Sequence, residues 1–179
     1  KIYGLYKPES EGVFRRLPKE VSVATSEGVD WLATNTAGGR LRFKTDSEYI
    51  AISMKVKEVC LMSHMAFCGS TGFDLYTKEN GEYICKKTFM PPTTIEGGIK
   101  VRDNGGFDGI YHFESREMRD ITINFPLYNN VDELYIGLSE DAIVLEGDKY
   151  SFDKPFLCYG SSITQGGCAS RPGNAYSNI

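Results

Sequence analysis

A strict alternation of apolar and other residues in one stretch limits the fold of this chain more than any other feature. The apolar positions are Ile50, Ile52, Met54 and Val56, and the positions between them are Ala51, Ser53, Lys55 and Lys57. A period of two residues places successive side chains on opposite faces of a β-strand. The stretch therefore predicts a strand with one buried face and one face in water.

Other stretches have the same alternation or a β-branched and aromatic composition. They are residues 41–43, 73–76, 82–87, 110–114, 121–125, 134–138 and 142–145. Asp46-Ser47 supplies turn chemistry between residues 41–43 and 50–56, and Asn80-Gly81 supplies a tight turn before residues 82–87. We therefore expect two hairpins. About nine short strands without a convincing amphipathic helix predict a mainly β protein, an antiparallel β-sandwich of the jelly-roll type.

Composition excludes several functional classes. The chain has 179 residues, is 41% hydrophobic, and carries a net charge of −4 without a run of basic residues, so we expect no nucleic-acid partner and no membrane partner. The five cysteines form no Cys-x-x-Cys and have no histidine at ligand spacing. We expect no metal site, no other cofactor, no full disulfide framework, and buried thiols at three or more of these positions.

The pattern changes after Tyr150. Residues 156–159 form a continuous apolar run, which is typical of a strand covered on both faces in a parallel α/β sheet. Small residues and hydroxyls follow at residues 160–166 and favour a transition from strand to loop to helix. We predict a β-sandwich domain at residues 1–150 and the incomplete start of an α/β/α hydrolase domain at residues 151–179.

Ser162 is the best candidate nucleophile. A serine between a strand and the following helix is well placed for attack, because backbone N–H groups there can stabilise an oxyanion. Thr164 stands where a Gly-x-Ser-x-Gly elbow would have its second glycine, which disfavours an α/β-hydrolase. The simpler alternative is that the Ser162 hydroxyl only caps the helix.

The residues around Ser162 resemble a known catalytic block. Gly160-Ser161-Ser162-Ile163 aligns with the Gly-Asp-Ser-Leu block of the GDSL or SGNH hydrolases. The longer stretch YGSSITQGGCASRPGNAY is similar to a bacterial branch of that family in which Ser replaces the Asp. The resemblance implies that Ser162 is the nucleophile, that Gly160, Ser161 and Ile163 form its loop, and that the Ser162 N–H helps to hold the oxyanion.

The same branch begins with a β-sandwich that is marked by a Gly-x-Asp-Leu-Tyr motif. This chain carries the motif at Gly72, Asp74, Leu75 and Tyr76. The resemblance therefore covers nearly the whole chain, as an accessory domain followed by the opening of a catalytic domain. It implies hydrolysis of acyl esters, with acetyl or other short acyl esters, including those on polysaccharides, as the substrate class.

The catalytic base of the resembling family lies in an Asp-x-x-His near the C-terminus. Seventeen residues follow Ser162 here, and none is a histidine. His64 and His112 precede the serine, so we expect them to be structural or partly exposed. Because a serine hydroxyl without a base is a poor nucleophile at neutral pH, we expect little esterase activity from this chain alone. The expected partners are the remainder of the catalytic domain and the acyl-ester or carbohydrate substrate.

A stand-alone module that binds carbohydrate or a partner protein is the alternative function. Trp31 is expected to pack in the core or at its edge, with a platform for a sugar ring as the alternative. For Asp74, acceptance of backbone N–H bonds near a turn is simpler than contact with a ligand. Gly38-Gly39-Arg40 predicts a turn, and Pro155 disfavours the helix that a Ser-x-x-Lys site at residues 151–154 would need.

Two further expectations concern the chain's setting. We expect a bacterial protein of the periplasm or the secreted fraction, although the chain starts at Lys1 without a leader. We also expect the segment after about residue 154 to be mobile, or to pack against a neighbouring molecule through Phe156, Leu157 and Tyr159, because an isolated strand of a parallel sheet cannot bury both faces.

Overall fold

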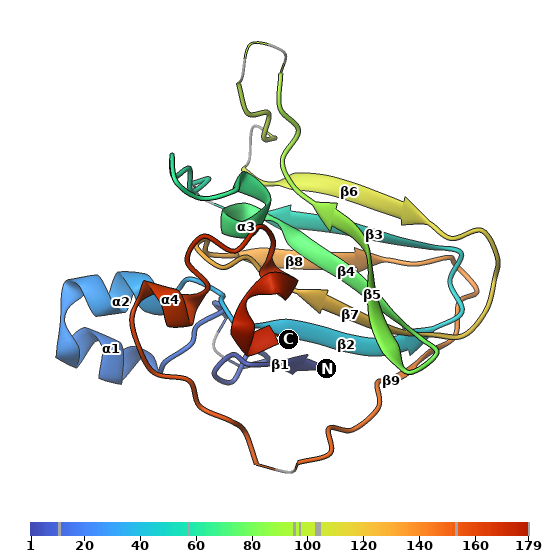
Figure 1. Ribbon diagram of the computed structural model, residues 1–179, viewed down its shortest axis with the longest axis horizontal. Coiled ribbons are helices and arrows are strands. Elements are labelled where there is room, and N and C mark those ends of the chain that lie inside the picture. The colour runs from blue at the N-terminus through green and yellow to red at the C-terminus, as the bar shows by residue number, and fades with distance from the viewer. Residues whose placement is uncertain are drawn as a thin grey trace.

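Two antiparallel β-sheets make up most of the structure, a computed structural model that describes residues 1–10, 12–56, 58–94, 96, 98–102, 105–152 and 154–178 (Figure 1). The larger sheet has the spatial order β1 (Ile2–Tyr3), β2 (Arg40–Thr45), β7 (Arg119–Asn124), β4 (Phe73–Glu79), β5 (Glu82–Phe89), and β9 (Val144–Glu146) also pairs with β2. The smaller sheet has the order β6 (Phe107–His112), β3 (Tyr49–Lys55), β8 (Glu133–Gly137). This arrangement confirms the predicted antiparallel β-sandwich. Lys57 of the alternating stretch, and Asp153 within the Ser-x-x-Lys pattern at residues 151–154, lie outside the described residues.

The core lies between the two sheets and is built by the alternation in their strands. Ile50, Ile52 and Met54 of β3 are at most 2% exposed, whereas the residues between them are half-buried. From the larger sheet, Leu75 and Ile123 reach the same core and are fully buried. Burial of such side chains contributes about 1.5–3 kcal/mol each, so these alternating stretches hold the sandwich together.

One of the two predicted hairpins is confirmed and the other is wrong. β4 and β5 pair around Asn80 and Gly81, which have φ angles of 51° and 89°, as a tight turn requires. β2 and β3, in contrast, belong to different sheets. The residues between them cross from one sheet to the other, and the side chains of Asp46 and Ser47 bond to distant loops as well as to their own neighbours.

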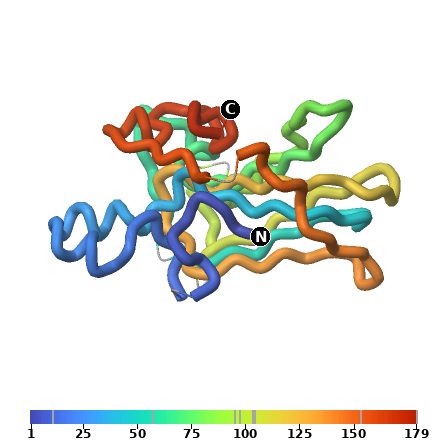
Figure 2. Tube along the Cα trace, turned by 90° about the horizontal axis from the view of Figure 1, so that it is seen from below, coloured from blue at the N-terminus to red at the C-terminus, as the bar shows by residue number. Residues whose placement is uncertain are grey.

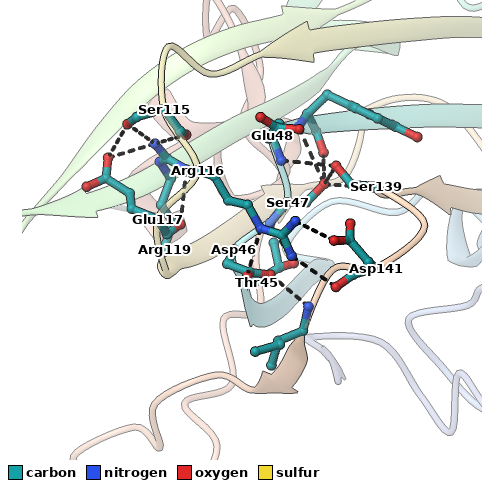
Figure 3. A network of polar contacts seen from close by, with 12 residues as sticks. Thr45, Asp46, Ser47, Glu48, Ser115, Arg116, Glu117, Arg119, Ser139 and Asp141 are labelled. Atoms are coloured by element: carbon teal, nitrogen blue, oxygen red, sulfur yellow. Dashed lines mark hydrogen bonds and ion pairs between the residues drawn. The ribbon is translucent and has the colours of Figure 1, made fainter.

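Polar contacts hold that crossing at the end of the sandwich (Figure 3). Asp46 accepts a hydrogen bond from the Ile143 N–H at 2.7 Å and pairs with Arg116, which also binds Asp141 at 2.6 Å. The Ser47 hydroxyl accepts a bond from the Ser139 N–H at 2.9 Å. These contacts join three loops and direct the chain from β8 back to β9 beside β2.

Three short helices in the first half of the chain were not predicted. They are α1 (Lys19–Thr25), α2 (Glu27–Ala33) and α3 (Phe67–Thr71). Ser26 caps α2 by accepting the Val29 N–H at 3.2 Å, and the buried Arg15 joins the two first helices through Ser22 and Asp30. Helices of two turns are too short to show a clear apolar period. Trp31 of α2 is 64% exposed, so its expected packing in the core is wrong.

The C-terminal segment differs from the prediction in two respects. Residues 156–159 are not a strand, because no described strand lies beside them, and Phe156, Leu157 and Tyr159 are 92%, 86% and 98% exposed. From Ser161 onward the chain packs against its own sandwich. Figure 2 shows this red segment along one side of the layered strands. It contains α4 (Ser162–Gln165) and the 3-10 turns η1 (Pro172–Asn174) and η2 (Tyr176–Asn178).

Within the described residues, no helix has the length and apolar character needed to span a bilayer, and no three His, Cys, Asp or Glu side chains gather as a metal site would require. All five cysteines are free thiols. Four are half-buried and Cys168 is exposed, so the expectation of mostly buried thiols is wrong.

Candidate functional site

Ser162 is the first residue of α4 and is exposed. The capping residue is Ser161, whose hydroxyl accepts the Ile163 N–H at 3.4 Å, so the Ser162 hydroxyl is not used as the helix cap. Among the described residues, neither the hydroxyl nor the backbone N–H of Ser162 has a hydrogen-bond partner. An accessible hydroxyl with an unpaired N–H on the same residue is the arrangement that attack on a carbonyl and stabilisation of its oxyanion require.

The loop before α4 has little room for side chains. Gly160 is exposed, but a Cβ built on it would lie 2.1 Å from the Thr164 Oγ1 atom, so a larger residue at this position would have to displace the Thr164 side chain. Ile163 is 73% exposed and contributes no buried contact to the sandwich. The structure thus brings the four loop residues predicted from the sequence together around one exposed helix start.

Two side-chain contacts from the sandwich hold this helix in place. The Tyr128 hydroxyl donates to the Ser162 carbonyl oxygen at 2.9 Å, and that oxygen also accepts the Gly167 N–H at 2.7 Å. At the end of α4, the Gln165 side-chain amide donates to the Leu127 carbonyl at 3.0 Å. The nucleophile candidate is therefore carried by a helix whose backbone is fixed to the sandwich.

Gln165 also connects α4 with the helical region of the first half of the chain. Its side-chain oxygen accepts a hydrogen bond from Arg16 at 3.3 Å, and Arg16 donates as well to the carbonyl of Leu32 in α2 at 2.6 Å. Its amide lies 3.4 Å from the Asn35 side-chain oxygen. Arg16 thus bridges α4 and α2, and Figure 1 shows these helices at the same end of the molecule.

The two histidines have contacts other than Ser162. His112 ends β6 in the smaller sheet, and its ring lies 5.7 Å from the ring of Tyr49. His64 is exposed in the loop before α3, and its carbonyl oxygen accepts the Cys168 thiol at 3.5 Å. Among the described residues, no imidazole hydrogen-bonds the Ser162 hydroxyl, as the sequence predicts.

The Gly-x-Asp-Leu-Tyr residues lie on β4 and at its start. Gly72 links α3 to the strand, Leu75 is buried in the core, and Asp74 is fully buried on the other face of the sheet. Burial raises the pKa of Asp74, and the Gly173 N–H, the Thr88 hydroxyl and Arg171 counteract that rise. Asp74 does accept a backbone N–H, but the donor is Gly173 rather than a residue of a nearby turn.

Sequence reasoning missed the residues that hold the Ser162 helix and the segment after it. They are Arg16, Tyr128, Gln165, Arg171 and Gly173. Gln165, Arg171 and Gly173 lie inside the stretch that carries the family resemblance, which is a signal that could have found them. Arg16 and Tyr128 lie in regions without a motif, so their contacts are visible only in the folded chain.

The chain thus combines an antiparallel β-sandwich with a short capped helix that begins at the exposed Ser162. The family model described as GxDLY, the N-terminus of SGNH-hydrolase-type esterases, matches residues 1–144. The model of the GDSL-like lipase and acylhydrolase family matches residues 153–179. The chain belongs to the SGNH hydrolase family, and its sandwich is the GxDLY type of N-terminal domain.

Solved structures agree with this assignment. A crystal structure described as a GDSL-like lipase from Bacteroides ovatus is 28% identical, has a TM-score of 0.79, and matches 99% of this chain but 49% of its own. The salicylyl-acyltransferase SsfX3 of a tetracycline biosynthetic pathway, 19% identical with a TM-score of 0.62, shares the fold over 97% of this chain and 46% of its own. This chain thus spans about half the length of both. No curated protein matches it.

Proposed function

We propose that this chain is the opening half of an SGNH-type esterase in which Ser162 attacks the carbonyl carbon of an acyl ester. The observation that carries the proposal is the exposed hydroxyl of Ser162, which has no hydrogen-bond partner in the part of the chain that the structure describes, on a helix held by contacts of Tyr128 and Gln165. In the reaction the hydroxyl oxygen forms a bond to the acyl carbon and its proton passes to a base outside this chain. The base returns that proton to the alcohol oxygen as the ester C–O bond breaks, and water then hydrolyses the acyl ester on Ser162. The Ser162 N–H is one donor to the oxyanion.

The remainder of the catalytic domain is the partner that this proposal requires. Phe156, Leu157 and Tyr159 are almost fully exposed just before the Ser162 loop. A continuous apolar run of this kind is suited to a strand that becomes buried once neighbouring strands pair with it. Both solved relatives have chains about twice as long as the part matched here, which supports a missing half that supplies the base.

Acetyl or other short acyl esters, including those on polysaccharides, are the proposed substrates. The experiment is labelling of the full-length protein with a fluorophosphonate probe, together with hydrolysis of p-nitrophenyl acetate. Ser162→Ala should abolish both signals. Ser161→Ala, which changes the neighbouring hydroxyl, should retain labelling with a slower rate. Absence of labelling in the full-length wild-type protein would refute the esterase proposal.

A carbohydrate-binding surface on the smaller sheet is a second candidate function. The outer face of this sheet has a shallow hollow of about 470 Å³, lined by small residues such as Ala51 and Gly137 and by Tyr135, which is 62% exposed. Ser53 and Asp108 also line the hollow, and polar groups beside an aromatic ring are suited to a sugar. Glycan titrations of Tyr135→Ala, with Trp31→Ala as a comparison, test this function, and unchanged binding would exclude this hollow.

A further inference from the structure

The residues of the Gly-x-Asp-Leu-Tyr motif lie on both faces of β4, and only one of these faces contributes to the core. Leu75 is fully buried between the sheets. Asp74 and Tyr76, its neighbours in β4, lie on the opposite face, as the period of a strand requires. Asp74 is nevertheless fully buried, although a carboxylate on the outer face of a sheet is normally in water. Another part of the chain must therefore cover it.

The covering part is the segment after the Ser162 helix. The Gly173 N–H donates to Oδ2 of Asp74 at 2.7 Å, and the Thr88 hydroxyl donates to Oδ1 at the same distance, so both carboxylate oxygens have a donor. The Arg171 Nε atom lies 3.8 Å from Oδ2. Because an unpaired buried carboxylate is costly, the burial of Asp74 depends on the Gly173 contact.

The ring of Tyr76 packs against the same turn, η1. A Cβ built on Gly173 would lie 2.2 Å from the Tyr76 Oη and 2.6 Å from two of its ring carbons, so the backbone of η1 lies directly on the ring. Arg171 donates from Nε to the same hydroxyl at 3.2 Å. Asp74 and Tyr76 together thus hold one short segment, Arg171 to Gly173, from two neighbouring outward positions of β4.

This contact continues to Ser162 through one packed residue. Ala175 follows η1, is 2% exposed, and forms a small cluster with Met65 and Leu127 of the sandwich. Its Cβ lies against Gly166, the residue that ends α4. α4 begins at Ser162, so a shift of η1 moves Ala175 away from the end of the helix that carries the serine.

We propose that Asp74 and Tyr76 form a positioning site for Ser162, in which they hold the turn at Gly173 and thereby restrain the helix that carries the serine. The inference rests on the proposed function for the role of Ser162. It assigns the Gly-x-Asp-Leu-Tyr motif to docking of the nucleophile segment and not to contact with a substrate. Neither residue reacts, and both act through the Arg171-to-Gly173 segment.

Backbone amide hydrogen exchange in this 179-residue chain tests the positioning site. Asp74→Ala removes the acceptor, and Gly173→Ala places a methyl group against the Tyr76 ring. Each should accelerate exchange of the Gly167 amide, which bonds to the Ser162 carbonyl, by about tenfold or more. Asp74→Asn retains an oxygen for the Gly173 N–H and should restore most of the protection.

Two controls separate positioning from general destabilisation. Gly28→Ala adds a methyl group where nothing lies within 4 Å, and Ile123→Ala weakens the core between the sheets while every bond to Asp74 is kept. Both should leave Gly167 exchange nearly unchanged. If Asp74→Ala also accelerates exchange of the β3 amides, that variant destabilises the whole sandwich, and the result for Gly173→Ala then decides whether the positioning site exists.

Unchanged Gly167 exchange in Gly173→Ala would overturn the inference. So would acceleration confined to Gly173 itself, because the turn would then be held without effect on the Ser162 helix. Failure of Ser162 labelling in the full-length protein would refute the esterase but would not alter these exchange rates. The two proposals therefore fail separately.

Discussion

Truncation of Leu127 should loosen the C-terminal segment without weakening the main core. Leu127 is fully buried, yet it belongs to a small second cluster with Met65 and Ala175, apart from the core between the sheets. A buried Leu-to-Ala change lowers the free energy of unfolding by about 2–5 kcal/mol. This cluster has few buried members and can relax into the space that the side chain leaves, so the loss here should be about 2–3 kcal/mol. That loss corresponds to roughly a 30- to 150-fold increase in opening of the segment.

Ile123→Ala is the matched comparison, because Ile123 is also fully buried but lies between the sheets. It should lower the free energy of global unfolding, measured by urea denaturation, by about 3–4 kcal/mol. Hydrogen exchange of the Gly167 and Ala175 amides should accelerate in Leu127→Ala and stay unchanged in Ile123→Ala. Equal acceleration in both variants would show that the segment and the sandwich open as one unit, and the reasoning would be refuted.

Two further changes have defined outcomes. The Ile143 N–H and Arg116 lower the pKa of Asp46 below 3.8, so its stabilisation is present above that value and is lost as the pH falls through the lowered pKa. Asp46→Asn should therefore show a weaker decline of the urea midpoint in acid, and an unchanged decline would contradict this. Gly160→Ala should push the new methyl group into Thr164 and slow fluorophosphonate labelling of the full-length protein, and unchanged labelling would show that the loop tolerates a side chain.

The parts of the fold that follow from short-range patterns were predictable. The alternation in residues 50–56 and the turn at Asn80 and Gly81 correspond to β3 and to the β4–β5 hairpin. The predicted partner of β3 was wrong, since β3 pairs with β6 and β8 and β2 lies in the other sheet. A turn signal shows that the chain changes direction, but it does not show to which sheet the next strand belongs.

The sequence predicted the residues of the candidate site but not the residues that hold it in place. The loop at residues 160–163 and the N-terminal motif were both identified from the sequence, and so was the lack of a histidine after Ser162. The contact between them was not predicted, because Asp74 and Gly173 are 99 residues apart. Tyr128, which holds the Ser162 carbonyl, carries no local signal at all.

The sequence by itself determined the inner faces of the sandwich and the identity of the exposed serine. Periodicity and turn chemistry are local properties, and they act over distances of a few residues. Only the tertiary structure decided that Asp74 is buried beneath Gly173, that Trp31 is exposed, and that residues 156–159 lack a sheet. Burial depends on what the rest of the chain places above a residue, and a strand exists only where another strand offers its backbone hydrogen bonds.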